Sequence, residues 1–128
     1  MLLHLSDVSP EPLHAQMSRQ IRAMILAGDL EEGEALPSIR GMASEQHVSV
    51  ITVQRAYDDL QREELIHSKW GKGFFVASLT DEQKQAMALD RLKENLAPIL
   101  SDALAGGLTP RGVLETVREI LKRRGGKR

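Results

Sequence analysis

The chain has 128 residues and a formal charge of −1 at pH 7, with 41% apolar and 27% charged residues. This length predicts one domain, or one domain with a small appendage, and the composition is that of a globular chain rather than a disordered or polybasic one. The absence of cysteine excludes disulfides, thiolate zinc sites and cysteine nucleophiles together.

Hydropathy and charge add further expectations. No apolar run approaches the roughly 20 residues of a membrane span, and the first five residues lack the basic lead of a signal peptide. We therefore expect a cytoplasmic protein without membrane contact. Residues 1–78 carry 7 basic and 11 acidic residues, whereas residues 79–128 carry 10 basic and 7 acidic residues.

Residues 10–28 have the pattern of an amphipathic helix. Pro10 and Pro12 suit a first helical turn, where a missing N–H has no intrahelical partner to lose, and Gly28 suits the left-handed cap that ends a helix. Apolar residues recur at the three- to four-residue spacing of one helix face: Leu13, Met17, Ile21, Met24 and Ile25.

Two shorter helices are predicted over residues 38–46 and 49–64, because each range begins with a serine that can cap the helix and continues with apolar residues at helical spacing. His47 and Val48 form the turn between them, which gives the pair helix-turn-helix dimensions. In such a motif the second helix enters the major groove, and its first residues meet the base edges.

The side chains expected on the exposed face of the second of these helices suit DNA. Glutamine and arginine can read adenine and guanine through paired hydrogen bonds, while Thr52 and the helix amides can hold phosphates. The exposed positions are Val50, Ile51, Thr52, Gln54, Arg55 and Asp58. From spacing alone, the alternative is an ordinary surface helix on which Gln54 and Arg55 are solvated.

A β-hairpin is predicted within residues 65–77 from two short strand-prone segments on either side of a turn that contains glycine. A hairpin at this place makes the motif a winged helix-turn-helix. Gly71 and Gly73 permit close approach to DNA, and Lys72 supplies charge for a phosphate or a minor groove. Trp70 could lie against a DNA sugar, but we expect it to cover the hairpin.

A second, helical unit is predicted after the hairpin, so we divide the chain into domains 1–78 and 79–128. Thr80 and Gln83 fit a capping box at the start of a long helix, which Pro98 should kink or split in two. This helix carries an apolar seam with the spacing of a coiled coil: Leu89, Leu92, Leu96 and Ile99.

A last helix is predicted from Pro110, with Thr109 as its cap and an apolar face that contains Val113, Val117 and Ile120. Two amphipathic helices enclose little core by themselves. The seam therefore needs another surface, which is either a second copy of the chain or its own winged domain. We expect a homodimer through the seam and the last helix's apolar face.

The basic C-terminus, residues 122–128, could touch flanking DNA. Favourable cations at the end of a helix are the simpler interpretation. We expect residues 125–128 to form a frayed end.

Metal binding and catalysis have little support. The four histidines lack metal-ligand spacing, and the neighbouring carboxylates at 58–59 and 63–64 diverge on a helix surface. We expect no metal, no cofactor and no enzyme activity. The competing hypothesis is a winged helix that binds another protein, since acidic residues exceed basic ones in residues 1–78.

Residues 10–77 as a set resemble the GntR-type transcriptional regulators. The first helix and the turn after it carry Pro12-Leu13-His14-x-Gln16, Ile21-Arg22, Gly28-x-Leu30 and Gly33. The next two helices carry Leu36-Pro37-Ser38-x-Arg40, Ala43, Val48-Ser49 and Thr52-Val53-x-Arg55-Ala56-Tyr57. The remainder carries Leu60, Glu63 or Glu64, Leu65-Ile66, Gly71-x-Gly73 and Phe75-Val76.

The resemblance implies DNA-binding roles at the matching positions. Arg40 would contact phosphate or base, Ser49 and Thr52 would contact the DNA backbone, and the turn of the hairpin would form the tip of the wing. Together with the reasoning from the residues, the expected DNA-binding set is Ser38, Arg40, Ser49, Val50, Ile51, Thr52, Gln54, Arg55, Gly71, Lys72 and Gly73.

The sequence departs from the family's pattern in three places, one of which spans two residues. Val50 and Ile51 stand where a polar or basic residue is common, and they could touch thymine methyl groups. Gly41 stands where a glutamate often closes a capping box with Ser38, which predicts a weaker helix start. Phe74 replaces a residue that is usually small.

Only residues 79–128 follow the winged helix, which resembles the short YtrA-like branch of the family, whose paired C-terminal helices form a dimer. The resemblance implies a bacterial transcriptional repressor that binds a pseudo-palindromic DNA operator as a homodimer. An unknown small-molecule effector would have to act at the dimer interface or beside the winged domain.

Overall fold

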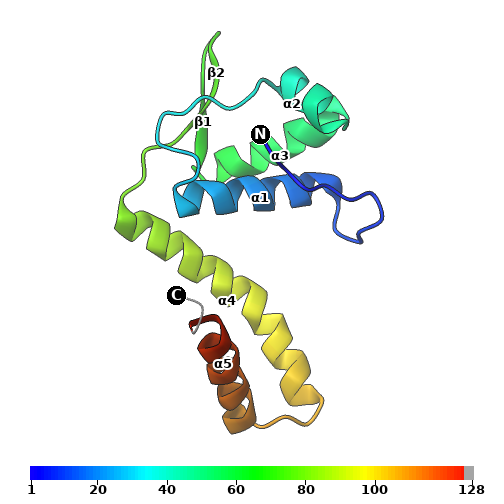
Figure 1. The fold of residues 1–128 in the computed structure, drawn as a ribbon, viewed down its shortest axis with the longest axis vertical. Helices are drawn as coiled ribbons and strands as arrows, with labels where there is room; N and C mark the ends of the chain where they lie inside the picture. The colour runs from blue at the N-terminus through cyan, green and yellow to red at the C-terminus, as the bar shows by residue number, and fades with distance from the viewer. Residues whose placement is uncertain (126–128) are drawn as a thin grey trace. The chain divides into compact units, whose positions relative to one another are not determined.

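The computed structural model describes residues 1–125, which form two compact units, one of residues 1–84 and one that begins at Gln85 (Figure 1). Five helices and one two-stranded hairpin in this range confirm the expected mainly α fold with a small β-hairpin. The elements in chain order are α1 (Leu13–Ala27), α2 (Ile39–Gln46), α3 (Val50–Arg62), β1 (Ile66–Lys69), β2 (Gly73–Val76), α4 (Asp81–Ala105) and α5 (Pro110–Gly125).

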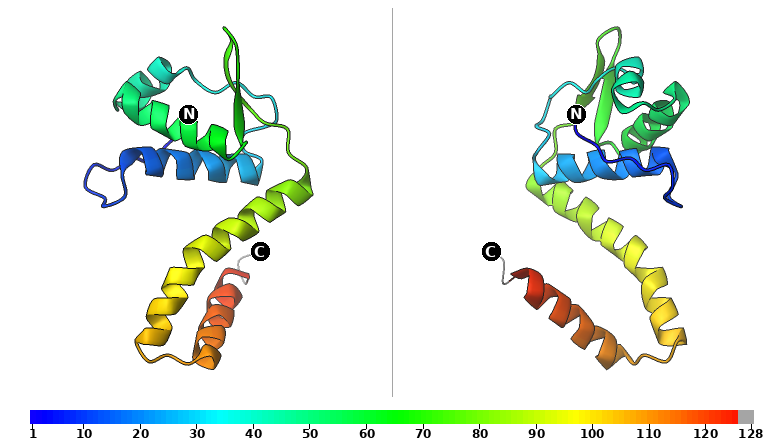
Figure 2. Two further views of the ribbon diagram at one scale, coloured as in Figure 1. Left: turned by 180° about the vertical axis from the view of Figure 1, so that it is seen from behind. Right: turned by 45° about the vertical axis from the view of Figure 1, so that its right-hand side comes forward.

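The first unit is built on a core between its three helices. α1 packs along α3, and α2 also packs against α3 (Figures 1 and 2). Completely buried side chains come from all three helices: Met17, Ile21, Met42, Val53, Ala56, Tyr57 and Leu60. Burial of each large apolar side chain of this kind stabilises the fold by roughly 1.5–3 kcal/mol. The helix-turn-helix pair, α2 and α3, is therefore fixed by a core that it shares with α1.

Left-handed residues set the turns between the helices. Gly28, with φ of 84°, ends α1 as predicted, and His47, with φ of 56°, forms the tight turn between α2 and α3. α3 ends at Arg62, slightly before the predicted end near Glu64. The reason is that Glu64 itself has a φ of 62° and turns the chain toward β1.

The hairpin has a third partner that the sequence analysis did not predict. β1 and β2 pair antiparallel, and residues 33–36, which we name the side strip, lie along the other edge of β2. The Gly33 N–H donates to Val76 O at 2.8 Å, the Val76 N–H to Glu34 O at 2.9 Å and the Leu36 N–H to Phe74 O at 2.9 Å. The wing is thus bonded to the segment that leads into α2.

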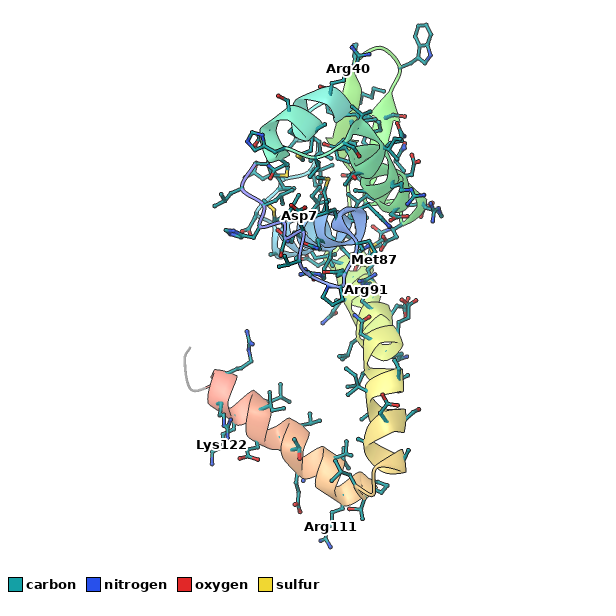
Figure 3. All side chains as sticks on the ribbon, turned by 90° about the vertical axis from the view of Figure 1, so that its right-hand side faces the viewer. Asp7, Arg40, Met87, Arg91, Arg111 and Lys122 are labelled. Carbon is teal, nitrogen blue, oxygen red and sulfur yellow. The ribbon has the colours of Figure 1, made fainter. Side chains whose placement is uncertain are left out.

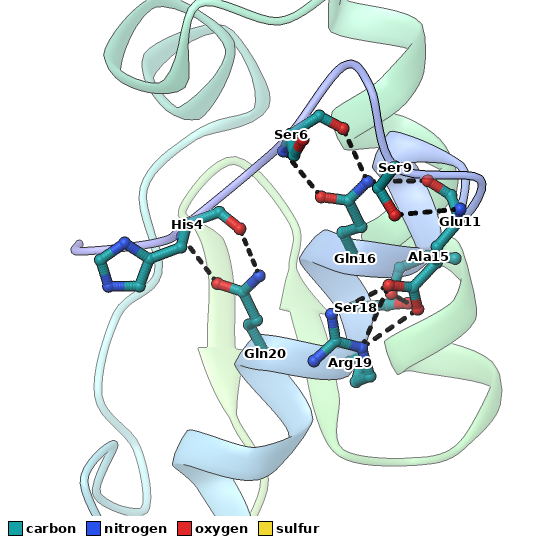
Figure 4. Close-up of polar contacts among 9 residues, drawn as sticks. All are labelled: His4, Ser6, Ser9, Glu11, Ala15, Gln16, Ser18, Arg19 and Gln20. Carbon is teal, nitrogen blue, oxygen red and sulfur yellow. Dashed lines mark hydrogen bonds and ion pairs between the residues drawn. The ribbon is translucent and has the colours of Figure 1, made fainter. Parts of the chain in front are cut away.

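The segment before α1 is also ordered against the helix, which the sequence analysis did not predict. The Gln16 side chain accepts from the Ser6 N–H at 2.8 Å and donates to Ser6 O at 3.0 Å (Figure 4). One turn later, Gln20 makes the same pair of bonds with His4, at 2.8 and 2.7 Å. Two glutamine amides therefore pair with this segment much as a neighbouring strand would.

A buried ion pair joins α1 to the end of α3. Arg22 Nε donates to Glu63 Oε1 at 2.8 Å, and its Nη2 donates to Oε2 at 2.5 Å. The Arg22 side chain is only 8% exposed. A two-pronged pair of this kind fixes orientation as well as distance, so the two helices are locked in register.

α4 runs from the end of the first unit into the second unit, which begins at Gln85. The capping box predicted at the start of α4 is confirmed. The Thr80 N–H donates to Gln83 Oε1 at 2.8 Å, and the Gln83 N–H donates to Thr80 Oγ1 at 3.1 Å. Pro98 lies inside one continuous helix, so the predicted split is wrong. Pro98 is exposed, and the carbonyl that loses its N–H partner can bond to water instead.

The predicted cap of α5 is confirmed. Thr109 Oγ1 accepts from the Gly112 N–H at 3.0 Å, and Pro110 is the first helical residue. α5 reaches Gly125, so this residue is helical and not part of a frayed end. The rest of the expected frayed end, Gly126, Lys127 and Arg128, lies outside the described residues.

Candidate nucleic-acid interface

Both helices of the helix-turn-helix begin with a serine that caps them. Ser38 Oγ accepts from the Gly41 N–H and Ser49 Oγ accepts from the Thr52 N–H, each at 3.0 Å. Ser49 Oγ also lies 2.9 Å from Thr52 Oγ1. α2 is capped without the glutamate that is common in the family, and a Cβ at position 41 would come within 3.0 Å of Ser38 Oγ. The exposed N-termini of α2 and α3 are favourable places for phosphates.

The outer face of α3 is apolar at its start and polar one turn later. Val50 is 48% exposed and Ile51 is 69% exposed. Gln54 and Arg55 are exposed as predicted, and Gln54 Nε2 donates to Asp58 Oδ1 at 2.9 Å. That bond fixes the plane of the Gln54 amide and leaves Oε1 and one N–H for a base edge.

The basic side chains of residues 1–78 fall into two groups. Three are paired with carboxylates just before α1 or around the end of α3: Arg19 with Glu11, Arg22 with Glu63, and Arg62 with Asp59. Four have no carboxylate partner within 4.0 Å among residues 1–125: Arg40, Arg55, Lys69 and Lys72. All four belong to α2, α3 or the hairpin, and Figure 3 shows Arg40 at the end of the unit from which the hairpin projects.

Arg55 has no carboxylate partner within 4.0 Å among residues 1–125, and its neighbouring carboxylates have other contacts. Asp58 accepts from Gln54 at 2.9 Å. Asp59 lies 3.3 Å from Arg62 and 3.6 Å from the His14 ring. The guanidinium of Arg55 is therefore available to a ligand, although the sequence alone could not decide between these partners.

The turn of the hairpin presents Lys72 and Trp70 to solvent. The Lys72 N–H donates to Lys69 O at 2.9 Å, which closes a tight turn, and Gly71 and Gly73 have φ of 72° and 99°. Trp70 has a relative exposure of 101%, so the expectation that it covers the hairpin is wrong. The physical reason is its position inside the tight turn, beyond the paired residues whose side chains flank the hairpin.

Tyr57 anchors the wing and the start of α2 to α3. Its ring meets the half-buried Phe74 edge-on at 5.0 Å, so the large residue at this position packs in the fold. Its hydroxyl donates to Pro37 O at 2.8 Å. Burial, assisted by the negative charge of Glu45, raises the pKa of Tyr57 well above its ordinary value. The hydroxyl therefore stays protonated and keeps its bond to the backbone.

The residues expected at a dimer interface lie on helices that bury none of their side chains within residues 1–125. Leu92 is 55% exposed, and Leu89, Ile99 and Ile120 are exposed to a similar degree. Leu96, Val113 and Val117 are half-buried. Between the two helices, an apolar cavity of about 230 Å³ is lined by Leu100, Leu104, Pro110, Val113 and Leu114. Within residues 1–125, this unit leaves these apolar side chains exposed or only half-covered.

Residues 1–125 contain no group of three His, Asp or Glu side chains that could hold a metal ion. None of the helices in the same range is long and apolar enough to cross a membrane.

The segment that contains the whole candidate interface matches a known family. Residues 13–76 match the family described as "Bacterial regulatory proteins, gntR family". This range includes α1, α2, α3 and the hairpin.

Individual relatives agree with the family match. The HTH-type transcriptional repressor YtrA of Bacillus subtilis (strain 168) is 27% identical over 119 residues, which cover 93% of this chain and 92% of that protein. YtrA from Sulfolobus acidocaldarius, a GntR-family transcription factor of solved structure, is 30% identical with a TM-score of 0.63, over 82% of this chain and 99% of that one. AraR(DBD), solved in complex with operator ORX1, is 27% identical with a TM-score of 0.54, over 60% of this chain and 99% of that one. These relatives are transcriptional regulators rather than enzymes, and the chain belongs to the gntR family of bacterial regulatory proteins.

Proposed function

We propose that this transcriptional regulator acts as a repressor that binds a specific DNA operator as a homodimer. One observation carries the proposal above all others. Four basic side chains of residues 1–78 have no carboxylate partner within 4.0 Å in the described residues 1–125, and all four belong to the helix-turn-helix or its wing: Arg40, Arg55, Lys69 and Lys72. Residues 1–78 are acidic overall, yet their unpaired cations lie on the elements that would meet DNA phosphates. This distribution of charge favours DNA over a protein partner.

The proposed interface assigns different tasks to its parts. α3 would lie in the major groove, where Gln54 and Arg55 can read base edges. Val50 and Ile51 would contact thymine methyl groups there, because apolar side chains discriminate thymine by that group. The capped N-termini of α2 and α3, with Ser38, Ser49 and Thr52, would hold phosphates and set the register of the helix on the duplex.

The second unit would supply the dimer. Its exposed apolar residues need a cover, and a second copy of the chain offers the same surface in return. Two-fold symmetry would then place two copies of α3 on half-sites about 34 Å apart, which corresponds to a pseudo-palindromic operator. The repressor named YtrA and the operator complex of AraR(DBD) support this proposal by similarity. The bound dimer would exclude polymerase sterically.

Control by a small molecule would act through the geometry of the dimer. An effector would bind at the proposed dimer interface within residues 79–128 or beside the winged domain. It would change the spacing of the two reading helices rather than cover them.

The salt dependence of binding tests the proposal. A duplex enriched from a random library by the full chain is titrated by fluorescence anisotropy between 50 and 200 mM salt, as is a scrambled duplex of the same composition. Each phosphate contact should contribute a slope of about 0.9 in log affinity against log salt. We expect a slope of several units and tighter binding to the enriched duplex. Equal binding to both duplexes, or no salt dependence, would contradict the proposal and favour a protein-binding module.

A further inference from the structure

Trp70 is a fully exposed tryptophan at the tip of the wing, and its exposure is unusual for this residue type. Its relative exposure is 101%, and it is the single tryptophan of the chain. Tryptophan is highly buried on average, because its large ring gains much from leaving water. The ring of Trp70 contributes no packing to its own fold. A contact with another molecule would therefore give the reason for a tryptophan at this position.

The chemistry around Trp70 suits a sugar-phosphate surface. Residues 65–77 contain no aspartate or glutamate. Lys72 lies two positions away in the same turn without a carboxylate partner in residues 1–125, and Lys69 has its Nζ 4.8 Å from the centre of the Phe75 ring. An aromatic ring beside unneutralised cations matches a ligand that offers an apolar sugar face beside an anionic phosphate.

The dimensions of DNA limit where the wing tip can go. The major groove is about 12 Å wide, and an α-helix with its side chains is about 10–12 Å across. With α3 in that groove, the hairpin has no room beside it and must reach the adjacent backbone or the minor groove. The hairpin is bonded to the side strip, residues 33–36, so its tip is held out from the unit.

We propose that Trp70 packs its indole ring against deoxyribose at the wall of the minor groove, next to the phosphate that Lys72 binds. This inference rests on the proposed DNA-binding function and adds to it a residue that the expected DNA-binding set did not include. Packing on sugar is independent of sequence, so Trp70 strengthens binding to every duplex by a similar factor.

The intrinsic fluorescence of the full chain tests the contact directly, because every tryptophan photon comes from Trp70. Acrylamide quenching is measured for the wild-type chain alone and with saturating enriched duplex, with saturation established independently by gel shift. We expect strong quenching in the free protein and clear protection in the complex. Quenching that stays unchanged in a complex visible by gel shift would overturn the inference while leaving the DNA-binding function intact. The absence of any complex would instead contradict the proposed function.

Variants measure how much the ring contributes. Removal of apolar ring surface from water is favourable, and partial cover of the indole ring by a sugar corresponds to about tenfold in affinity. Trp70→Ala should therefore weaken binding about tenfold on both the enriched and the scrambled duplex, and Trp70→Phe should recover most of the loss. Val8→Ala, which trims an apolar side chain that is also almost fully exposed, is the matched control and should bind like the wild type.

Two other outcomes would overturn the inference. A loss confined to the enriched duplex would mean that Trp70 reads bases rather than sugar. Protection of Trp70 that rises with protein concentration in the absence of DNA would assign the ring to a protein contact. Circular dichroism verifies that each variant folds, which the full exposure of Trp70 leads us to expect.

Discussion

Arg40 carries a charge that its own fold does not neutralise. It is exposed on α2 and has no carboxylate within 4.0 Å in the described chain. Loss of a hydrogen bond to a charged group costs about 1.5–3 kcal/mol. We therefore expect Arg40→Ala to weaken DNA binding about tenfold to a hundredfold in gel-shift titrations, with an unchanged circular dichroism spectrum.

A matched arginine provides the control for Arg40. Arg62 is also exposed on a helix of the first unit, but it pairs with Asp59 at 3.3 Å, so Arg62→Ala should leave DNA affinity within about twofold. Arg55→Ala should resemble Arg40→Ala, because Asp58 and Asp59 have other contacts. Equal affinities of Arg40→Ala and Arg62→Ala at moderate salt would remove Arg40 from the interface.

Tyr57 predicts the alkaline behaviour of the fold. Burial raises the pKa of Tyr57 above its ordinary value of about 10. The neutral hydroxyl is thus favoured in the folded state, and this contribution to stability is complete below pH 10 and is lost as the pH rises through the raised pKa. Because the chain has one tyrosine, tyrosinate absorbance should appear at a higher pH in the folded chain than in urea, together with unfolding. Titration near pH 10 with an intact fold would show that Tyr57 is not buried as described.

At the scale of elements, we assign to the wing a phosphate contact that is separate from the proposed reading helix. Lys72 is exposed in the turn of the hairpin. Lys72→Ala should lower the salt slope by about one unit and weaken binding equally on enriched and scrambled duplexes, as loss of one phosphate contact does. Arg19→Ala is the control, since it removes a cation of α1 that is already paired with Glu11. An unaltered slope with an altered base preference would mean that Lys72 reads bases.

The helices could be predicted because their signals are local. Ser38 and Ser49 indicate helix starts, because each side chain accepts a hydrogen bond from the backbone N–H three residues ahead. Gly28 indicates a helix end, because glycine readily adopts the positive φ of a helix cap. The side strip, residues 33–36, had no such signal. Its order comes from backbone bonds to β2, some 40 residues later in the chain, and no periodicity of its own sequence reports them.

For the candidate interface, the sequence predicts the positions of the site residues but not which of their charges are unpaired. The order of the family's residues indicates the positions that face DNA. It does not say which charge remains free. Arg55 has two neighbouring carboxylates at helical spacing, yet in residues 1–125 these groups contact Gln54, Arg62 and His14 and not Arg55. The exposure of Trp70 likewise depends on the geometry of one tight turn.

At the scale of the whole molecule, the apolar seam of α4 predicts the state of assembly. Leu92→Glu combined with Leu96→Glu places two charges in the surface that we assign to the dimer. Desolvation of such charges is costly, so we expect monomers in analytical ultracentrifugation that bind single half-sites weakly.

The control for the seam keeps the charge and changes the face. Ala97 and Ser101 are exposed on the other side of α4, so Ala97→Glu with Ser101→Glu adds the same two charges away from the seam. This variant should remain a dimer and keep its affinity for the enriched duplex. An intact dimer in the Leu92→Glu, Leu96→Glu variant would refute the interface and the proposed route of control with it.

The side strip has a mechanical consequence for how the molecule meets DNA. Residues 33–36 bond to β2 and continue into Pro37, whose carbonyl accepts from Tyr57 on α3, while the ring of Tyr57 meets Phe74 in the wing. Wing, α2 and α3 are thereby closed into one loop of contacts. We therefore expect α3 and the wing to move as one body, so that a duplex whose groove spacing does not match must itself deform. The energy of that deformation depends on base sequence, and the fold can therefore discriminate between operators at base pairs that no side chain touches.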